Sequence, residues 1–186
     1  MPDRTGHLFL AGALVNEFIK TILNKKIIYT FARKLVCSIM KNRILFVCIH
    51  NSARSQMAEE LMRKICDSDM ETESAGLTPG ALNPLAVEVL FEEGIDIRGK
   101  QTRDVFEVYK SGKLFSHVIT VCDEASAERC PIFPGVVKKI HWSLPDPSQF
   151  EGTWEEKLEQ TRAVRDQIKE KILEFCESNC ALAIAV

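Results

Sequence analysis

ILFVCIHNSARS, residues 44–55, is the segment of this chain that decides the fold. Its apolar run at 44–47 is typical of a buried strand. After the segment, apolar residues recur at helical spacing over 57–65. The pattern therefore predicts a strand that ends at Cys48, a short loop, and a helix that begins near Arg54.

The predicted loop has the composition of an oxyanion-binding site. Backbone N–H groups of a short loop that enters a helix converge on one point with partial positive charge, and Arg54 adds a planar fork for two anion oxygens. The same field favours the thiolate form of Cys48, which would make it a nucleophile at neutral pH. Ser55 can donate its hydroxyl to the sulfur, while Asn51 and Ser52 are predicted to support the loop. The alternative is a buried structural cysteine beside a surface arginine.

Residues 48–59 resemble the anion loop of low-molecular-weight tyrosine phosphatases and, more closely, of the arsenate reductases built on that fold. The matching segments downstream are SAG (74–76), LNP (82–84), GIDI (94–97), VITVC (118–122), CP (130–131), HW (141–142) and DP (146–147). The resemblance covers about residues 40–178. It implies a single three-layer α/β domain with a central, mainly four-stranded parallel sheet flanked by helices. His50 departs from the pattern, because such loops often carry Gly there.

Patterning along the chain supports alternating strands and helices, which imply a parallel sheet. We expect strands at 71–75, 117–122 and 136–142, and helices at 85–93, within 102–112, and from 153 to about 176. Asn83 before Pro84 is a helix start, and Thr153 followed by Glu156 resembles a capping box. Ligands bind at the carboxyl ends of parallel strands, so Cys48 and Cys122, each expected at a strand end, can share that edge.

Cys122 and Cys130 are separated by a segment rich in charged residues. This arrangement can carry a thiol relay. Two buried structural cysteines are the plain alternative, because a cysteine packs well as a small hydrophobe. A zinc site with histidines is disfavoured, since the short spacing of paired zinc-binding cysteines is missing.

The resemblance implies reduction of arsenate to arsenite and a role in arsenic detoxification. That reduction takes two electrons, the sequence has no flavin or nicotinamide fingerprint, and two thiols that become one disulfide supply two electrons. In the resembling reductases the nucleophile attacks arsenic, two further cysteines carry the disulfide outward, and thioredoxin reduces it. These roles fall on Cys48, Cys122 and Cys130, although the last two are one residue further apart than in the best-known members.

Asp146 lies in LPDP, residues 144–147, a loop stiffened by two prolines. By composition it is a turn-forming Asp before Pro. The resemblance implies instead that it is the general acid that protonates the departing oxygen. Glu59, Ser74 and Asp104 match positions that, with Asn51, hold a monovalent cation in some relatives.

The competing function is a phosphatase that hydrolyses a phosphotyrosine-like ester through a Cys48 phosphocysteine. Phosphatases of this family usually place Tyr after the Asp-Pro pair, but SQF follows here at 148–150. Cys122 and Cys130 would also have no role in a phosphatase. A non-catalytic anion-binding adaptor is a third alternative, in which Cys48 and Arg54 would be incidental.

Composition is consistent with one enzyme domain in the cytoplasm. The chain has 186 residues, and 46% of them are hydrophobic, which is enough for one good-sized core. Its formal net charge is −2, and it has no basic tract that would suggest nucleic-acid binding. Its 7 cysteines are odd in number and scattered, unlike a secreted disulfide scaffold. We expect no metal and no organic cofactor.

Residues 1–39 differ in charge from the rest, with six basic and two acidic side chains. An apolar stretch at 7–15 superficially resembles a signal peptide, but acidic and polar residues interrupt both its flanks, and it is too short to span a bilayer. Three interpretations are open: a cytosolic amphipathic or poorly ordered extension, a weak membrane-surface helix, or a misassigned start codon ahead of Met40. We favour the last, with the domain at 40–178 and a C-terminal tail at 179–186.

Overall fold

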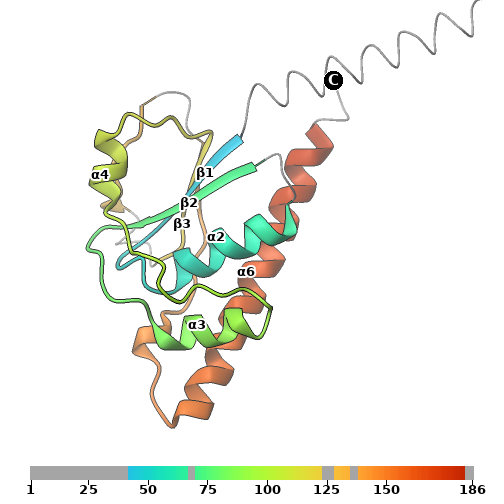
Figure 1. The fold of residues 1–186 in the computed structure, drawn as a ribbon. Helices are drawn as coiled ribbons and strands as arrows, with labels where there is room; N and C mark the ends of the chain where they lie inside the picture. The colour runs from blue at the N-terminus through green and yellow to red at the C-terminus, as the bar shows by residue number, and fades with distance from the viewer. Residues whose placement is uncertain (1–41, 67–69, 123–127, 135–137, 183–186) are drawn as a thin grey trace, which may run out of the picture. The chain divides into compact units, whose positions relative to one another are not determined.

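A four-stranded parallel sheet forms the centre of the fold (Figure 1). The computed structural model describes residues 42–66, 70–122, 128–134 and 138–182, so residues 1–39 and the end of the predicted tail lie outside the described residues. The strands are β1 (Asn42–Cys48), β2 (Met70–Gly76), β3 (His117–Thr120) and β4 (Lys138–His141). Their order is β2-β1-β3-β4 and every neighbouring pair is parallel. The predicted sheet is confirmed.

The central position of β1 explains its unbroken apolar run, because both faces of an inner strand are covered. Ile44 and Phe46 belong to a buried cluster with residues of α2 (Arg54–Ile65), α3 (Pro84–Phe91) and α6 (Trp154–Leu182). Leu45 and Val47 belong to a second cluster, on the side of α4 (Val105–Lys110). Figure 1 shows α4 apart from the other three helices. The three predicted layers are therefore confirmed.

Two helix starts follow their predicted caps. The side chain of Asn83 accepts a hydrogen bond of 2.9 Å from the backbone N–H of Leu85, with Pro84 in the first turn of α3. Before α6, Thr153 donates its backbone N–H to Glu156 Oε2 at 2.7 Å, and Thr153 Oγ1 accepts from the backbone N–H of Glu156 at 3.3 Å. This is a capping box.

Helix α6 runs to Leu182, six residues beyond the predicted end. No Gly or Pro interrupts the chain between residues 154 and 182, so no helix-breaking residue ends it earlier. A short 3-10 helix, η1 (Pro147–Gln149), precedes it. None of the helices in the described part of the chain is long and apolar enough to cross a membrane.

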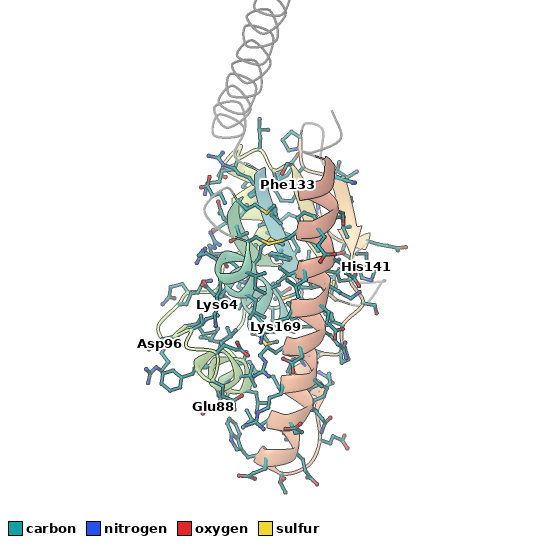
Figure 2. All side chains as sticks on the ribbon, turned by 90° about the vertical axis from the view of Figure 1, so that its right-hand side faces the viewer. Lys64, Glu88, Asp96, Phe133, His141 and Lys169 are labelled. Atoms are coloured by element: carbon teal, nitrogen blue, oxygen red, sulfur yellow. A yellow bond between two sulfur atoms is a disulfide. The ribbon has the colours of Figure 1, made fainter. Side chains whose placement is uncertain are left out.

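Ion pairs join the end of α3 to α2 and α6. Lys169 Nζ donates to Glu93 Oε1 at 2.5 Å, and Lys64 Nζ lies 3.5 Å from Glu93 Oε2. Figure 2 labels both lysines, Lys64 of α2 and Lys169 of α6. The hydrogen bond from Lys169 is the main reason that the pKa of Glu93 lies below its ordinary value. These contacts link the segment after α3 to the last turn of α2 and to α6.

Candidate active site

Cys48 ends β1, and the chain then turns through residues 49–53 into α2. The thiol is buried, with 2% of the residue exposed. The helix starts at Arg54, and its N-cap residue, Ala53, makes no side-chain capping hydrogen bond. The first N–H groups of α2 are therefore not used by a side-chain cap, as an anion site at a helix start requires.

The segment after β2 supports the loop along its length. Four backbone N–H groups from this segment donate to the carbonyl oxygens of residues 48, 49, 50 and 52 at 2.8–3.0 Å; the donors are Leu77, Thr78, Gly80 and Asn83. His50 adds a contact of 3.0 Å between its Nδ1 and the Thr78 carbonyl oxygen. Backbone contacts with the segment after β2 thus hold much of the loop in place.

Gly76 is required where this support comes closest. A Cβ atom at position 76 would lie 2.6 Å from the backbone nitrogen of Asn51 and 2.8 Å from the carbonyl carbon of His50. Both neighbours are backbone atoms and cannot move aside cheaply. Asn51 itself has a φ of 51°, in the left-handed region that Asn tolerates better than most residues. Its backbone N–H donates to the Cys48 sulfur.

Two donors surround the Cys48 sulfur. The backbone N–H of Asn51 donates to Sγ at 3.1 Å, and the Ser55 hydroxyl lies 3.0 Å from Sγ. Asn51 Nδ2 donates to Ser55 Oγ at 2.9 Å. Because that bond fills an acceptor position of Ser55, the hydroxyl proton of Ser55 is available for the sulfur. The predicted contact between Ser55 and Cys48 is therefore present.

The orientation of the Asn51 amide is set by its neighbours. Its Oδ1 accepts from the backbone N–H of Arg103 at 2.9 Å, and a backbone N–H can only donate. Nδ2 must therefore face the two serines, Ser55 and Ser74, and it donates to Ser74 Oγ at 2.8 Å. Ser74 in turn donates to Glu59 Oε2 at 2.5 Å. A buried chain of hydrogen bonds thus runs from Glu59 to the nucleophile.

Basic side chains contact the Glu59 carboxylate. Lys100 Nζ lies 2.8 Å from Glu59 Oε2, and Arg63 donates to Glu59 Oε1 at 2.7 Å. Asp104 caps α4 by accepting from the Phe106 N–H. No cluster of three His, Cys, Asp or Glu residues suited to a metal ion occurs among the described residues.

Arg54 and Asp146 meet across the site. Arg54 Nη2 donates to Asp146 Oδ2, and Arg54 Nη1 donates to the Leu144 carbonyl oxygen at 3.1 Å. Only 4% of Arg54 is exposed. Asp146 Oδ1 accepts from the Ser148 N–H at 3.0 Å, so Asp146 also caps η1. The turn-forming role and the place beside the anion loop are therefore both present.

Cys122 lies near the Cys48 edge of the sheet. It comes two residues after β3 rather than at its end, and the preceding Val121 donates its N–H to the Val47 carbonyl oxygen at 2.8 Å. Cys122 and Cys48 both belong to the buried cluster under α2, α3 and α6. The shared edge that the sequence predicts is present.

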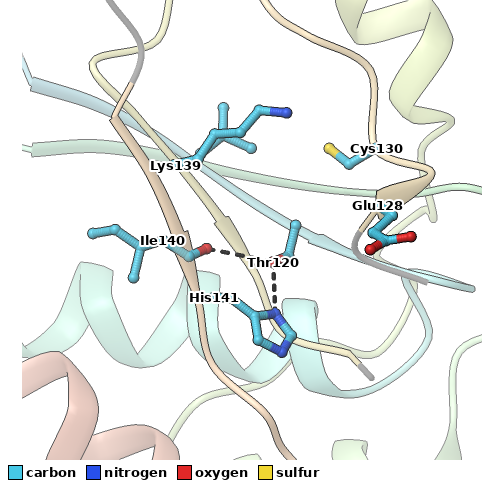
Figure 3. A pocket seen from close by; sticks show the side chains of 7 residues that line it. Thr120, Glu128, Cys130, Lys139, Ile140 and His141 are labelled. Carbon is cyan, nitrogen blue, oxygen red and sulfur yellow. Dashed lines mark hydrogen bonds between the residues drawn. The ribbon is translucent and has the colours of Figure 1, made fainter. Parts of the chain in front are cut away.

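Cys130 belongs to the other buried cluster, on the α4 side of the sheet. It lines a cavity of about 320 Å³ together with Val118, Thr120, Glu128, Lys139, Ile140 and His141 (Figure 3). Burial raises the pKa of the Cys130 thiol to about 11, and the nearby Lys139 opposes that rise. His141 contacts Thr120 Oγ1 through Nδ1 at 2.9 Å. Sequence patterning did not separate Cys122 and Cys130 onto two sides, because no spacing rule reports which face a loop cysteine joins.

A disulfide joins Cys66, at the end of α2, to Cys176 on α6. Cys48, Cys122 and Cys130 remain thiols. The bridge spans 110 residues, and nothing in the sequence spacing indicates it. It lies at the opposite end of α2 from the anion loop, so it is outside the candidate relay.

Comparison with known protein families shows the family to which this chain belongs. Residues 43–181 match the family described as Low molecular weight phosphotyrosine protein phosphatase. The chain belongs to that family. The low-molecular-weight phosphatase-like fold implied by the sequence is therefore confirmed, and the loop at 48–54 is its anion loop by resemblance.

The relatives to which this chain is similar include arsenate reductases. An arsenate reductase of Bacillus licheniformis is 42% identical over 140 residues, which cover 74% of this chain and 97% of that protein. The solved structure "An arsenate reductase in oxidized state" has a TM-score of 0.61 and 29% identity, over 75% of this chain and 98% of that one. "An arsenate reductase in the phosphate binding state" has a TM-score of 0.57 and 26% identity, over 74% of this chain and 98% of that one.

Proposed function

We propose that this protein reduces arsenate to arsenite, with Cys48 as the nucleophile. The observation that carries this proposal is the combination of an anion loop around a buried thiol with two further thiols, one on each side of the sheet. The similarity to arsenate reductases over 97% of the length of one relative supports the same substrate. The solved relative in a phosphate-binding state supports a tetrahedral oxyanion as ligand.

Arsenate binds at the start of α2. Its oxygens accept hydrogen bonds from the backbone N–H groups of residues 49–54 and from the guanidinium of Arg54. The anion then takes the place of Asp146 as the partner of Arg54. Ser52 and Asn51 support the loop, and Ser55 stabilises the Cys48 thiolate by its hydroxyl. Asp146, released from Arg54, is then placed to give a proton to the departing oxygen.

The chemistry is a two-electron transfer from thiols. The Cys48 thiolate attacks arsenic(V), and one arsenate oxygen leaves as water after protonation. The Cys122 thiolate then attacks the Cys48 sulfur, a disulfide forms between them, and the electron pair of the broken sulfur–arsenic bond leaves with arsenic(III) as arsenite. Cys130 attacks Cys122, which moves the disulfide outward and regenerates the Cys48 thiolate.

A dithiol reductant closes the cycle, and we infer that it is thioredoxin in the cytoplasm. Cys130 lines a cavity and belongs to the buried cluster on the α4 side of the sheet, whereas Cys48 belongs to the cluster on the other side. A protein dithiol that reaches the outer disulfide from the α4 side would leave the backbone contacts of the anion loop intact. Arsenic detoxification is the physiological role that such an activity serves.

Phosphatase activity is the second candidate, favoured by membership of the family. Cys48, Arg54 and Asp146 are also the groups that a phosphocysteine mechanism needs. Two observations disfavour it as the main function. Ser148 follows the Asp-Pro pair where an aromatic ring would contact the substrate, and Cys122 and Cys130 would be unused.

The testing experiment measures arsenite release from arsenate by the full chain. Parallel reactions contain thioredoxin with its reductase, glutaredoxin with glutathione, or no reductant. We expect sustained release with the thioredoxin system. Efficient hydrolysis of an aryl phosphate without arsenite release in any reaction would favour the phosphatase.

A further inference from the structure

The cavity around Cys130 contains a cationic side chain that the proposed relay does not yet use. Lys139 lies on β4 next to Val118 in the parallel register, and both residues line this cavity. Figure 3 shows the Lys139 side chain extending toward the side of the cavity where Cys130 lies, with the Cys130 sulfur pointing toward the lysine. Among the described lining residues, Lys139 is the one with a side chain that is cationic at neutral pH; Glu128, Cys130 and His141 are the other titratable groups there.

Cys130 needs such a neighbour because its surroundings oppose ionisation. It is 6% exposed and packs with apolar residues of the α4 side. Burial raises the pKa of this thiol to about 11, and the charge of Lys139 acts against that rise. Thiol–disulfide exchange requires the thiolate as the attacking species. A buried thiol without a counter-charge would therefore attack slowly.

We propose that Lys139 is a positioning residue that holds the Cys130 thiolate in this cavity for its attack on Cys122. The proposal rests on the relay described above. In the step concerned, Cys130 has lost its proton to solvent and its sulfur bonds to the Cys122 sulfur. The Cys48–Cys122 bond breaks, and its electron pair leaves on Cys48 as a thiolate. No external oxidant or reductant takes part.

Lys138 provides a matched control on the same strand. Successive side chains of a strand point to opposite faces, and Lys138 pairs in register with His117, whose ring packs against Phe175 of α6. The pKa of His117 is lowered by burial and, second, by the charge of Lys138. The two neighbouring lysines therefore act on different groups, on opposite faces of the sheet.

The test is the pH profile of Cys130 alkylation in the full chain. A Cys122→Ser background prevents the disulfide with Cys130, and mass spectrometry of the Cys130 peptide follows its reaction with iodoacetamide between pH 7 and pH 9, where a lysine side chain is charged. Lys139→Met should slow alkylation across this range by about three- to tenfold, since one pKa unit is a tenfold change in thiolate. Lys139→Arg should restore the rate, and Lys138→Met should leave it unchanged.

An unchanged alkylation rate in Lys139→Met, or an equal loss of rate in Lys138→Met, would overturn the proposal. Lys139 and Lys138 are both exposed, so the variants should fold, and a thermal melt checks this. Alkylation needs neither arsenate nor a reductant. A Lys139-dependent profile in a protein that reduces no arsenate would overturn the proposed function but support the effect on Cys130. An active wild type with a Lys139-independent profile would overturn the Lys139 proposal alone.

Discussion

The guanidinium of Arg54 pairs with the carboxylate of Asp146, so the anion loop and the Asp-Pro loop are joined. Arg54 is also bound to the Leu144 carbonyl oxygen at 3.1 Å. These contacts use two of the five N–H donors of the guanidinium. An oxyanion that binds at Nη2 competes with Asp146 for that position, which would couple substrate binding to the release of the proposed general acid.

Asp146→Asn tests two roles of Asp146, as the ion-pair partner of Arg54 and as the proposed general acid. The variant keeps the shape of the side chain but carries no charge for Arg54 and no proton of suitable acidity. We expect phosphate to bind at least as tightly as in wild type, measured by calorimetry. Turnover of arsenate should fall by about 10²–10⁴-fold, the usual contribution of a general acid. Near-normal turnover would mean that Asp146 only caps η1.

Gly76→Ala tests the close approach between β2 and the anion loop. The added Cβ would meet the Asn51 nitrogen at 2.6 Å, so the loop must shift. We expect a loss of about 1–3 kcal/mol in the free energy of unfolding, typical of overpacking, and weaker phosphate binding. Gly80→Ala is the matched control, because its nearest neighbour would be His50 Cβ at 3.6 Å. Equal behaviour of the two variants would contradict the account of Gly76.

Parts of this arrangement could be predicted from the sequence, and the reasons differ from residue to residue. The strand before Cys48 and the helix after it follow from apolar periodicity, and Asn83 and Thr153 are recognisable caps. Those signals are local. The Arg54–Asp146 pair joins residues 92 positions apart, and their meeting could be expected only from the family resemblance.

Other features had no sequence signal. The approach of Gly76 to Asn51 depends on how two loops pack, and the placement of Cys130 on the α4 side depends on the path of the chain after β3. The Cys66–Cys176 bridge depends on how α2 lies against α6. Pattern reading sees neighbours along the chain, whereas these contacts are set by tertiary packing.

The disulfide should contribute to stability but not to the reaction. A Cys66→Ser, Cys176→Ser double variant is expected to lose about 2–5 kcal/mol of unfolding free energy under non-reducing conditions, as for other removed native disulfides. Its arsenite release under thioredoxin should match wild type, because the bridge lies away from Cys48. Loss of turnover with unchanged stability would place these two cysteines in the relay instead.

The second exchange should depend on pH. The pKa of Cys130 is raised to about 11 by burial, so its thiolate fraction grows tenfold per pH unit below that value. Formation of the Cys122–Cys130 disulfide in a single turnover should therefore accelerate with rising pH, measured by rapid quench and mass spectrometry. A rate that levels off below pH 8 would show that Cys130 attacks from a different, more exposed arrangement.

The relay itself is tested by counting arsenite molecules per enzyme with thioredoxin and its reductase present. Wild type should turn over continuously. Cys130→Ser should release at most about one arsenite and then stop with Cys48 bound to Cys122, because no thiolate remains to free the nucleophile. Cys122→Ser should release none catalytically, although it can still bind arsenate. Sustained multiple turnover by the Cys122→Ser, Cys130→Ser double variant would contradict the relay.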